Sequence, residues 1–227
     1  KAGGLRNWIV MKLARASAGV ISTNHEDFKR LAALANAALI PIGSSVAVGL
    51  PHDFDRAAWR SRLGAGESDF VVAHFGFINH TKGVDTLVQA ARLLLDARVP
   101  VRLWFVGDRT GSSDPTNAEF ANRIETLTSE LGLMDRTTWT GFVGDEEASA
   151  CFASCDVVAL LFTDGASYRR SSLMAGIAHG SAILTTLPAV EIPAFRAEEN
   201  LSFVPANDPE SAADALKELW RSPEKRL

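Results

Sequence analysis

The chain has 227 residues, of which 47% are hydrophobic and 22% are charged, and its formal net charge is −4. This apolar content suffices for one well-cored domain with a smaller additional piece. The acidic balance gives no sign of nucleic-acid binding, and no apolar run approaches the roughly 20 residues that a membrane-spanning helix needs.

The stretch at residues 7–20 combines apolar side chains with the charges of Lys12 and Arg15. These charges interrupt the apolar core that a signal peptide would need. We expect an ordinary amphipathic helix here, and a helix that lies on a membrane surface is the second interpretation.

A short strand, a helix and a second strand are expected next, at residues 18–22, 25–35 and 38–42. Asn24 stands directly before the helix, where its side chain can cap the free N–H groups. Since 42 residues are too few for an independent domain, we interpret residues 1–42 as the last β-α-β piece of an N-terminal domain.

Residues 43–52 contain two glycines, two serines and a proline, and their apolar residues follow no helix or strand period. This composition is typical of a linker, and we predict that the segment is mobile. A short helix is expected at residues 55–63. Residues 43–68 therefore form the predicted connection to the second domain.

From residue 69 onward, apolar runs alternate regularly with helical stretches. Strands are expected at 69–75, 101–106, 137–140, 156–162, 182–186 and 201–204, and helices at 84–97, 117–131, 146–153, 169–178 and 209–220. The first and fourth strands are almost entirely apolar, which is typical of strands covered on both faces. The pattern predicts an α/β fold, a Rossmann-like doubly wound parallel sheet, over residues 69–227.

The only cysteines are Cys151 and Cys155. They are too few for a disulfide framework, and no second pair is present for a zinc site. We expect both to be small buried side chains, which fits a reducing compartment.

The ends of the first three strands of this region carry the first candidate site residues, because doubly wound sheets bind ligands at the carboxyl ends of their strands. Gly76 ends the first strand, and Lys82 precedes the next helix, where free N–H groups favour an anion. A solvated lysine is the alternative. After the second and third strands come Gly107, Asp108, Phe142 and Val143.

The richest polar stretch follows the fourth strand and reads D-G-A-S-Y-R-R-S-S from Asp164 to Ser172. Arg169 and Arg170 are expected to open the next helix, where cations are unfavourable unless an anion joins them. Paired guanidinium groups suit a phosphate, so we predict a phosphate site; salt bridges to carboxylates are the alternative. His179, at the end of this helix, is interpreted as structural.

Taken together, these motifs resemble those of the retaining GT-B glycosyltransferases of family four, the glycosyl transferases group 1. The shared features are G-x5-K-G after the first strand, V-G-D after the second, G-F-V before an acidic helix and the late segment F-V-P-A-N-D-P-E-S. The early segments G-V-I-S-T-N and I-P-I-G resemble the end of that family's N-terminal domain.

The resemblance implies a domain that binds a nucleotide-sugar without a metal or other cofactor. It implies a cytoplasmic enzyme, with peripheral attachment to the inner face of the membrane as the alternative. It implies that most of the acceptor-side domain lies outside this chain, so this fragment alone is expected to be inactive. Its expected diphosphate ligands are Gly76, Lys82, Arg169, Arg170 and Ser171, and its expected nucleoside or sugar ligands are Gly107, Asp108, Phe142, Val143, Asp164, Gly165 and Ser167.

The chain departs from the family pattern at two glutamates, one for the sugar and one for the ribose, which are replaced by Ser167 and Ala175. The family's arginine after the first-strand glycine is replaced by Phe77. A GT-B nucleotide-sugar 2-epimerase and a non-catalytic nucleotide-binding module are the alternative functions. A dinucleotide-binding domain is disfavoured, because no G-x-G-x-x-G follows any strand.

Overall fold

The apolar strands predicted from residue 69 onward form one six-stranded sheet in the computed structural model, which describes residues 2–34, 36–109, 115–197 and 199–226. All pairings in this sheet are parallel, and the strand order is β5-β4-β3-β6-β7-β8. The strands are β3 (Phe70–Phe75), β4 (Val101–Val106), β5 (Thr137–Trp139), β6 (Val157–Leu160), β7 (Ile183–Thr186) and β8 (Ser202–Val204). The predicted doubly wound sheet is confirmed.

The strand order reverses between β3 and β6. From β3 the chain moves outward through β4 to β5, and it then returns to place β6 against the other side of β3, with Val72 opposite Val157. Ligands of such sheets bind where the order reverses, outside the carboxyl ends of the strands. The loops that follow β3 and β6 are therefore the first place to look for a site.

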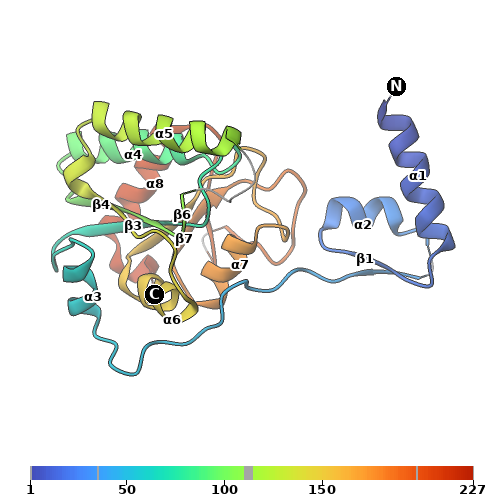
Figure 1. Cartoon of the computed structure of the whole chain (residues 1–227), viewed down its shortest axis with the longest axis horizontal. Coiled ribbons are helices and arrows are strands. Elements are labelled where there is room, and N and C mark those ends of the chain that lie inside the picture. Colours follow the sequence, from blue (N-terminus) through green and yellow to red (C-terminus); the bar gives the residue numbers. More distant parts are fainter. Residues whose placement is uncertain (1, 35, 110–114, 198, 227) are drawn as a thin grey trace.

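Helices cover both faces of the sheet (Figure 1). One face carries α4 (Val84–Asp96), α5 (Pro115–Glu130) and α8 (Pro209–Arg221), and the other carries α3 (Arg56–Arg62), α6 (Asp145–Ser154) and α7 (Ser171–Ala178). Two short 3-10 helices lie at Met134–Arg136 and Pro223–Arg226. No helix in the described part of the chain is long and apolar enough to cross a membrane.

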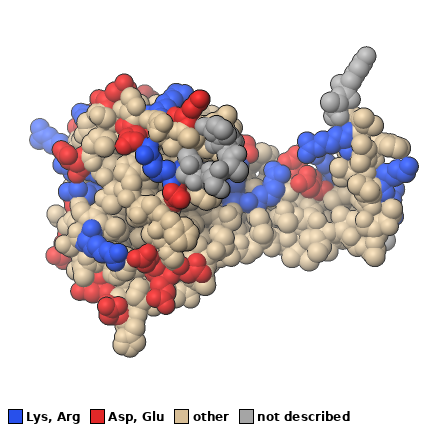
Figure 2. Space-filling view, in the orientation of Figure 1, with Lys and Arg blue, Asp and Glu red and all other residues tan. Residues whose placement is uncertain are grey.

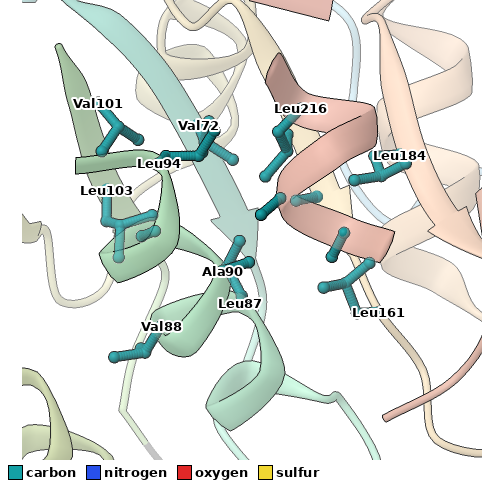
Figure 3. Close-up of a cluster of buried hydrophobic side chains, with 14 of the residues drawn as sticks. Val72, Leu87, Val88, Ala90, Leu94, Val101, Leu103, Leu161, Leu184 and Leu216 are labelled. Atoms are coloured by element: carbon teal, nitrogen blue, oxygen red, sulfur yellow. The ribbon is translucent and has the colours of Figure 1, made fainter. Parts of the chain in front are cut away.

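The larger core lies between the sheet and the helices α4 and α8 (Figure 3). Leu87 and Leu94 of α4 and Leu216 of α8 are fully buried and face the strands, as the apolar stripe of α4 predicts. Burial of one such side chain contributes roughly 1.5–3 kcal/mol to the free energy of unfolding. This packing fixes α4, and with it the loop that joins β3 to α4.

The N-terminal piece forms a separate, smaller β-α-β unit (Figure 1). It contains α1 (Ala2–Ala16), β1 (Val20–Ser22), α2 (His25–Leu31) and β2 (Ala37–Leu39), and β1 and β2 pair in parallel. Asn24 caps α2 as predicted, since its Oδ1 accepts from the N–H of Asp27 at 2.9 Å. The division of the chain at residues 42 and 68 stays a prediction.

Helix α2 ends at Leu31, earlier than the predicted end at residue 35. The reason is a pair of tertiary hydrogen bonds. The side-chain amide of Asn36 donates to the backbone carbonyl of Ser17 at 2.8 Å, and the backbone carbonyl of Asn36 accepts from the N–H of Val20. The chain has to turn before Asn36 to make these bonds.

The segment at residues 43–52 has neither helix nor strand, yet it is attached to α6. Val46 is buried in the core, and the N–H of Ala47 donates to the carboxylate of Asp145 at 3.1 Å. The N–H of Gly49 donates to the hydroxyl of Ser149 at 3.3 Å. These contacts attach the segment to the larger unit, whereas its composition predicted a mobile linker.

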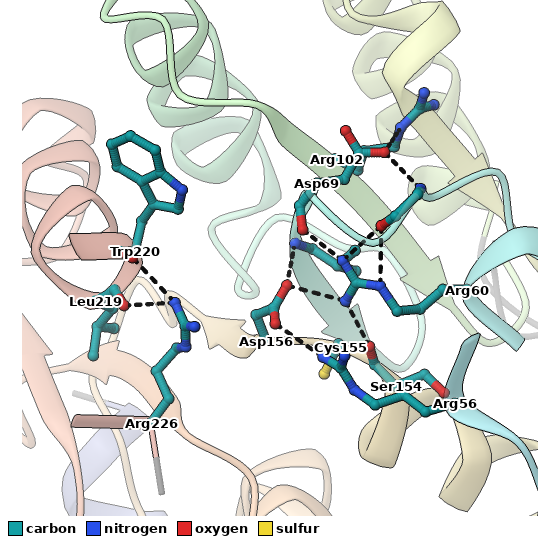
Figure 4. A network of polar contacts seen from close by, with 12 residues as sticks. Arg56, Arg60, Asp69, Arg102, Ser154, Cys155, Asp156, Leu219, Trp220 and Arg226 are labelled. Carbon is teal, nitrogen blue, oxygen red and sulfur yellow. Dashed lines mark hydrogen bonds and ion pairs between the residues drawn. The ribbon is translucent and has the colours of Figure 1, made fainter. Parts of the chain in front are cut away.

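Arg60 of α3 is a buried cation, only 2% exposed, at the amino ends of the strands (Figure 4). Its guanidinium pairs with the carboxylate of Asp156 at 3.1 Å and donates to the carbonyls of Gly66, Asp69 and Ser154. Asp156 also accepts from the backbone N–H of Val71 at 2.8 Å. One side chain thereby joins α3 to the beginnings of both β3 and β6.

Candidate functional site

The loops after β3 and β6 touch each other at the reversal point. The N–H of Thr163 donates to the carbonyl of Thr81 at 3.1 Å. Gly83 has a φ of +59°, and a Cβ there would lie 1.8 Å from the carbonyl oxygen of Leu161. Only glycine fits this position, because the backbones of the two loops meet there.

Lys82 projects from the first loop toward the start of α7. Its Nζ donates to the hydroxyl of the buried Ser172 at 3.1 Å and lies 5.3 Å from the ring centroid of Phe162. A Cβ on Gly76 would come within 3.8 Å of the same Nζ, so the missing side chain leaves the ammonium approachable from the strand end.

Arg170 reaches the same aromatic ring from the second loop. Its guanidinium carbon lies 4.6 Å from the ring centroid of Phe162, and it forms an ion pair with Asp164. The side chain is 18% exposed, and its Nε is buried without a partner among the described residues. Two cations from distant parts of the sequence therefore share one ring.

Burial shapes the charge of this site. It lowers the pKa of Lys82 to about 8, and the charge of Arg170 adds to that effect. Burial also lowers the pKa of Arg170. Beneath them on β3, burial together with the charge of Lys82 lowers the pKa of His74 to about 3, so this imidazole is neutral at pH 7. Partly dehydrated cations would gain from an added anion.

The arginines do not open α7 as expected. The helix begins at Ser171, and Arg170 is the residue before it, with φ −88° and ψ 89°. The N–H of Arg170 donates to the carbonyl of Ser167 at 3.0 Å, and this turn delays the helix. Of the two serines, Ser171 is exposed, and the neighbouring Ser172 contacts Lys82.

Arg169 points away from Lys82 and Arg170. It is 52% exposed, and its Nη1 lies 3.8 Å from the carboxylate of Asp27 on α2. Figure 2 shows basic and acidic side chains interspersed between the larger unit and the N-terminal piece. Both arginines thus face a carboxylate, as the salt-bridge interpretation expects, because Arg170 pairs with Asp164. Of the two, Arg170 is the one that also lies with Lys82 against Phe162.

The loops after β4 and β5 lie next to this pair. Gly107 has a φ of +115°, and a Cβ there would lie 3.5 Å from the Cα of Gly76, so the two glycines permit a close approach of backbones. Gly107 also forms an isolated bridge with Gly141. Beyond it, Phe142 is 83% exposed and Val143 packs partly into the core. Asp108 is exposed, and its carboxylate accepts from the N–H of Arg109.

A small cleft of about 40 Å³ separates the second loop from α2. Gly165 and Ser167 line it from one side and His25 from the other. The Ser167 hydroxyl and His25 Nδ1 are buried without partners among the described residues, and His25 stacks on Tyr168 at 5.6 Å. Ser167 thus lies where the loop faces the N-terminal piece. Ala175, the second departure from the family pattern, is fully buried.

Two groups that sequence patterns single out have structural roles. His179 contacts the carbonyl of Ala175 at 2.7 Å and the hydroxyl of Ser149 at 2.8 Å, and it stacks on Phe152. Burial raises the pKa of Cys151 to about 12, so this thiol stays protonated and unreactive. The contacts of His179 agree with its structural interpretation. Cys151 is buried as expected, whereas Cys155 is half-buried.

Ser172 and Phe162 are the site residues that sequence reasoning missed. Phe162 reads as the last residue of an apolar strand, and Ser172 as one of two adjacent serines at a helix start. Their role becomes visible only once the turn at residues 167–170 is known, because this turn determines which side chains of the loop after β6 face Lys82.

A family model described as Glycosyl transferases group 1 matches residues 69–222. Two similar curated proteins are named D-inositol 3-phosphate glycosyltransferase. The one from Mycobacteroides abscessus is 32% identical over 73% of this chain and 35% of its own length, and the one from Streptomyces coelicolor is 26% identical over 76% and 37%. The chain spans about a third of the length of these relatives.

Solved structures share the fold. Anabaena HepE in complex with UDP and glucose has a TM-score of 0.79 at 18% identity, covering 97% of this chain and 58% of that one. Sucrose-phosphate synthase from Thermosynechococcus elongatus has a TM-score of 0.74 at 22% identity, covering 98% and 54%.

Proposed function

Because the chain belongs to the group 1 family of glycosyl transferases, we propose that it is the donor-binding half of an enzyme that transfers a sugar from a nucleotide-sugar with retention. The observation that carries the proposal is the convergence of Lys82 and Arg170 over Phe162 at the reversal point of the sheet. The remainder of an N-terminal domain would supply the groups that contact the acceptor.

Lys82 and Arg170 would bind the donor diphosphate. A guanidinium fork and an ammonium suit phosphate oxygens, and Gly76 leaves room for them beside the strand end. When the bond to the sugar breaks, negative charge grows on the departing diphosphate. Two fixed cations stabilise that charge, which lowers the barrier without a metal ion.

The loops after β4 and β5 are the proposed nucleoside site. Phe142 exposes an aromatic ring on which a base can stack, and Asp108 offers a carboxylate to hydroxyl groups. The structure of HepE in complex with UDP and glucose supports a nucleotide-sugar as the class of ligand.

A non-catalytic nucleotide-binding module is the second candidate. The positions of the two family glutamates, Ser167 and Ala175, carry no carboxylate here. Such a module would keep the cation pair and lack the means to hold the sugar. The epimerase alternative gains no support from the curated relatives, which are named as glycosyltransferases.

Calorimetric titration of the chain with UDP, GDP and ADP in the presence of a chelator tests the proposal. We expect one of the three to bind and the corresponding nucleoside to bind much more weakly, because it presents no phosphate. Sugar transfer is expected only when the chain is extended by the rest of the N-terminal domain. If none of the three diphosphates binds, the proposal is wrong; binding without transfer by the extended protein favours the non-catalytic module.

The affinity for UDP is expected to fall as the pH rises through about 8. A diphosphate beside Nζ favours the charged form of Lys82, so binding draws a proton once the pH exceeds the pKa of about 8 in the free protein. The loss approaches tenfold per pH unit until the pKa of the bound state is reached. Titrations between pH 7.5 and 9.5 measure it. A Lys82→Arg variant, which stays charged, should give a flat profile, and a similar slope in both proteins would contradict the assignment.

A further inference from the structure

Arg170 already has an anion partner within the chain. Its guanidinium pairs with the carboxylate of Asp164, whose side chain is 58% exposed, whereas the arginine side chain is 18% exposed and lies against Phe162. The cation is therefore half-buried, and its carboxylate partner stands at the solvent side of the site.

The backbone around Asp164 is fixed. Gly165 has a φ of +90°, and a Cβ there would lie 2.5 Å from the carbonyl oxygen of Leu187. The N–H groups of Gly165 and Ala166 donate to the carbonyls of Phe162 and Thr186, each at 3.2 Å. One of these bonds closes a turn within the loop, and the other ties the loop to β7. Together they keep the carboxylate of Asp164 beside Arg170.

A diphosphate that reaches Arg170 brings negative charge next to Asp164. Two like charges several ångströms apart near a protein surface repel each other by an amount that solvent and salt only partly screen. In the absence of a diphosphate, the same carboxylate offsets the charge of the half-buried Arg170. Asp164 therefore stabilises the unliganded site and opposes the ligand.

We propose that Asp164 is an internal competitor of the diphosphate: its carboxylate holds Arg170 when no ligand is bound and has to yield the guanidinium when a diphosphate binds. The inference rests on the proposed function of the site. It changes the expected role of Asp164 from a ligand of the nucleoside or sugar to a group that limits affinity and promotes product release, a step that limits the turnover of many enzymes.

The test is Asp164→Asn, which keeps the shape of the side chain and removes its charge. We expect UDP to bind about tenfold more tightly, mainly through slower dissociation, as measured by calorimetry and stopped-flow release. Inorganic pyrophosphate, which has no base or ribose, should also bind more tightly. Uridine should bind as in the parent, and Asp164→Glu, which keeps the charge, should bind UDP within about threefold of the parent.

Asp96→Asn is the matched control. Asp96 is 54% exposed and pairs with Arg92 at the far end of α4, so its replacement makes the same change in net charge away from the site. Equal tightening by both variants would overturn the inference, because net charge would then explain it. Unchanged or weaker UDP binding by Asp164→Asn, with weaker binding by Arg170→Ala, would also overturn it and leave the diphosphate site standing. Parent-like binding of UDP by Arg170→Ala and Lys82→Ala would overturn both.

Discussion

Arg60→Ala is expected to lower the free energy of unfolding by about 3–5 kcal/mol. The change removes the buried partner of Asp156 and leaves the carbonyls of Gly66 and Ser154 without their donor. Arg56, which contacts Asp156 from the surface at 3.0 Å, can offset only part of this loss. Urea unfolding with an unchanged m-value measures the effect.

Arg92→Ala is the matched control for this measurement, because its ion pair with Asp96 is exposed and should contribute at most about 1 kcal/mol. The double variant Arg60→Met with Asp156→Asn should recover part of the stability, since it leaves no buried charge. Equal destabilisation by the two single arginine variants would mean that the contacts of Arg60 with the beginnings of β3 and β6 do not stabilise the fold more than an exposed ion pair does.

Arg170→Ala is expected to weaken UDP binding about tenfold to a hundredfold, because charge-assisted hydrogen bonds contribute roughly 1.5–3 kcal/mol each. Binding of uridine should hardly change. Arg170→Lys should recover only part of the loss, since a point charge cannot make the forked contact. Calorimetric titration of each variant supplies the comparison.

Arg169→Ala gives the sharpest control, because Arg169 is the neighbour in sequence but faces Asp27 across the cleft. We expect it to bind UDP within about threefold of the parent. Equal losses at both positions would mean that both arginines reach the diphosphate, as the sequence alone suggested, and that the contact with Asp27 gives way when the ligand binds.

The sheet could be predicted because its strands carry local signals. Near-continuous apolar runs such as Val157–Leu160 mark strands covered on both faces, and the helix stripe of α4 repeats at its own period. The meeting of Lys82 with Arg170 followed from topology, since loops at the carboxyl ends of parallel strands share one edge.

The details of the site depend on a turn that has no clear sequence signature. Two arginines before Ser171 look like the first residues of a helix, but the bond from Arg170 to Ser167 holds them outside it and sends their side chains in different directions. The buried contacts of Arg60 could not be predicted from the sequence either. Its partners lie at the ends of three different segments, and no local spacing relates them.

The attachment of residues 43–52 to α6 also determines where the N-terminal piece can pivot. The N–H of Ile40 still donates to Ser22, and Val46 is already buried against the larger unit, so the covalent hinge is confined to residues 41–45. A rotation of the N-terminal piece about so short a hinge would have to break the contacts between α2 and the loop before α7. These contacts are the stacking of His25 on Tyr168 and the approach of Asp27 to Arg169.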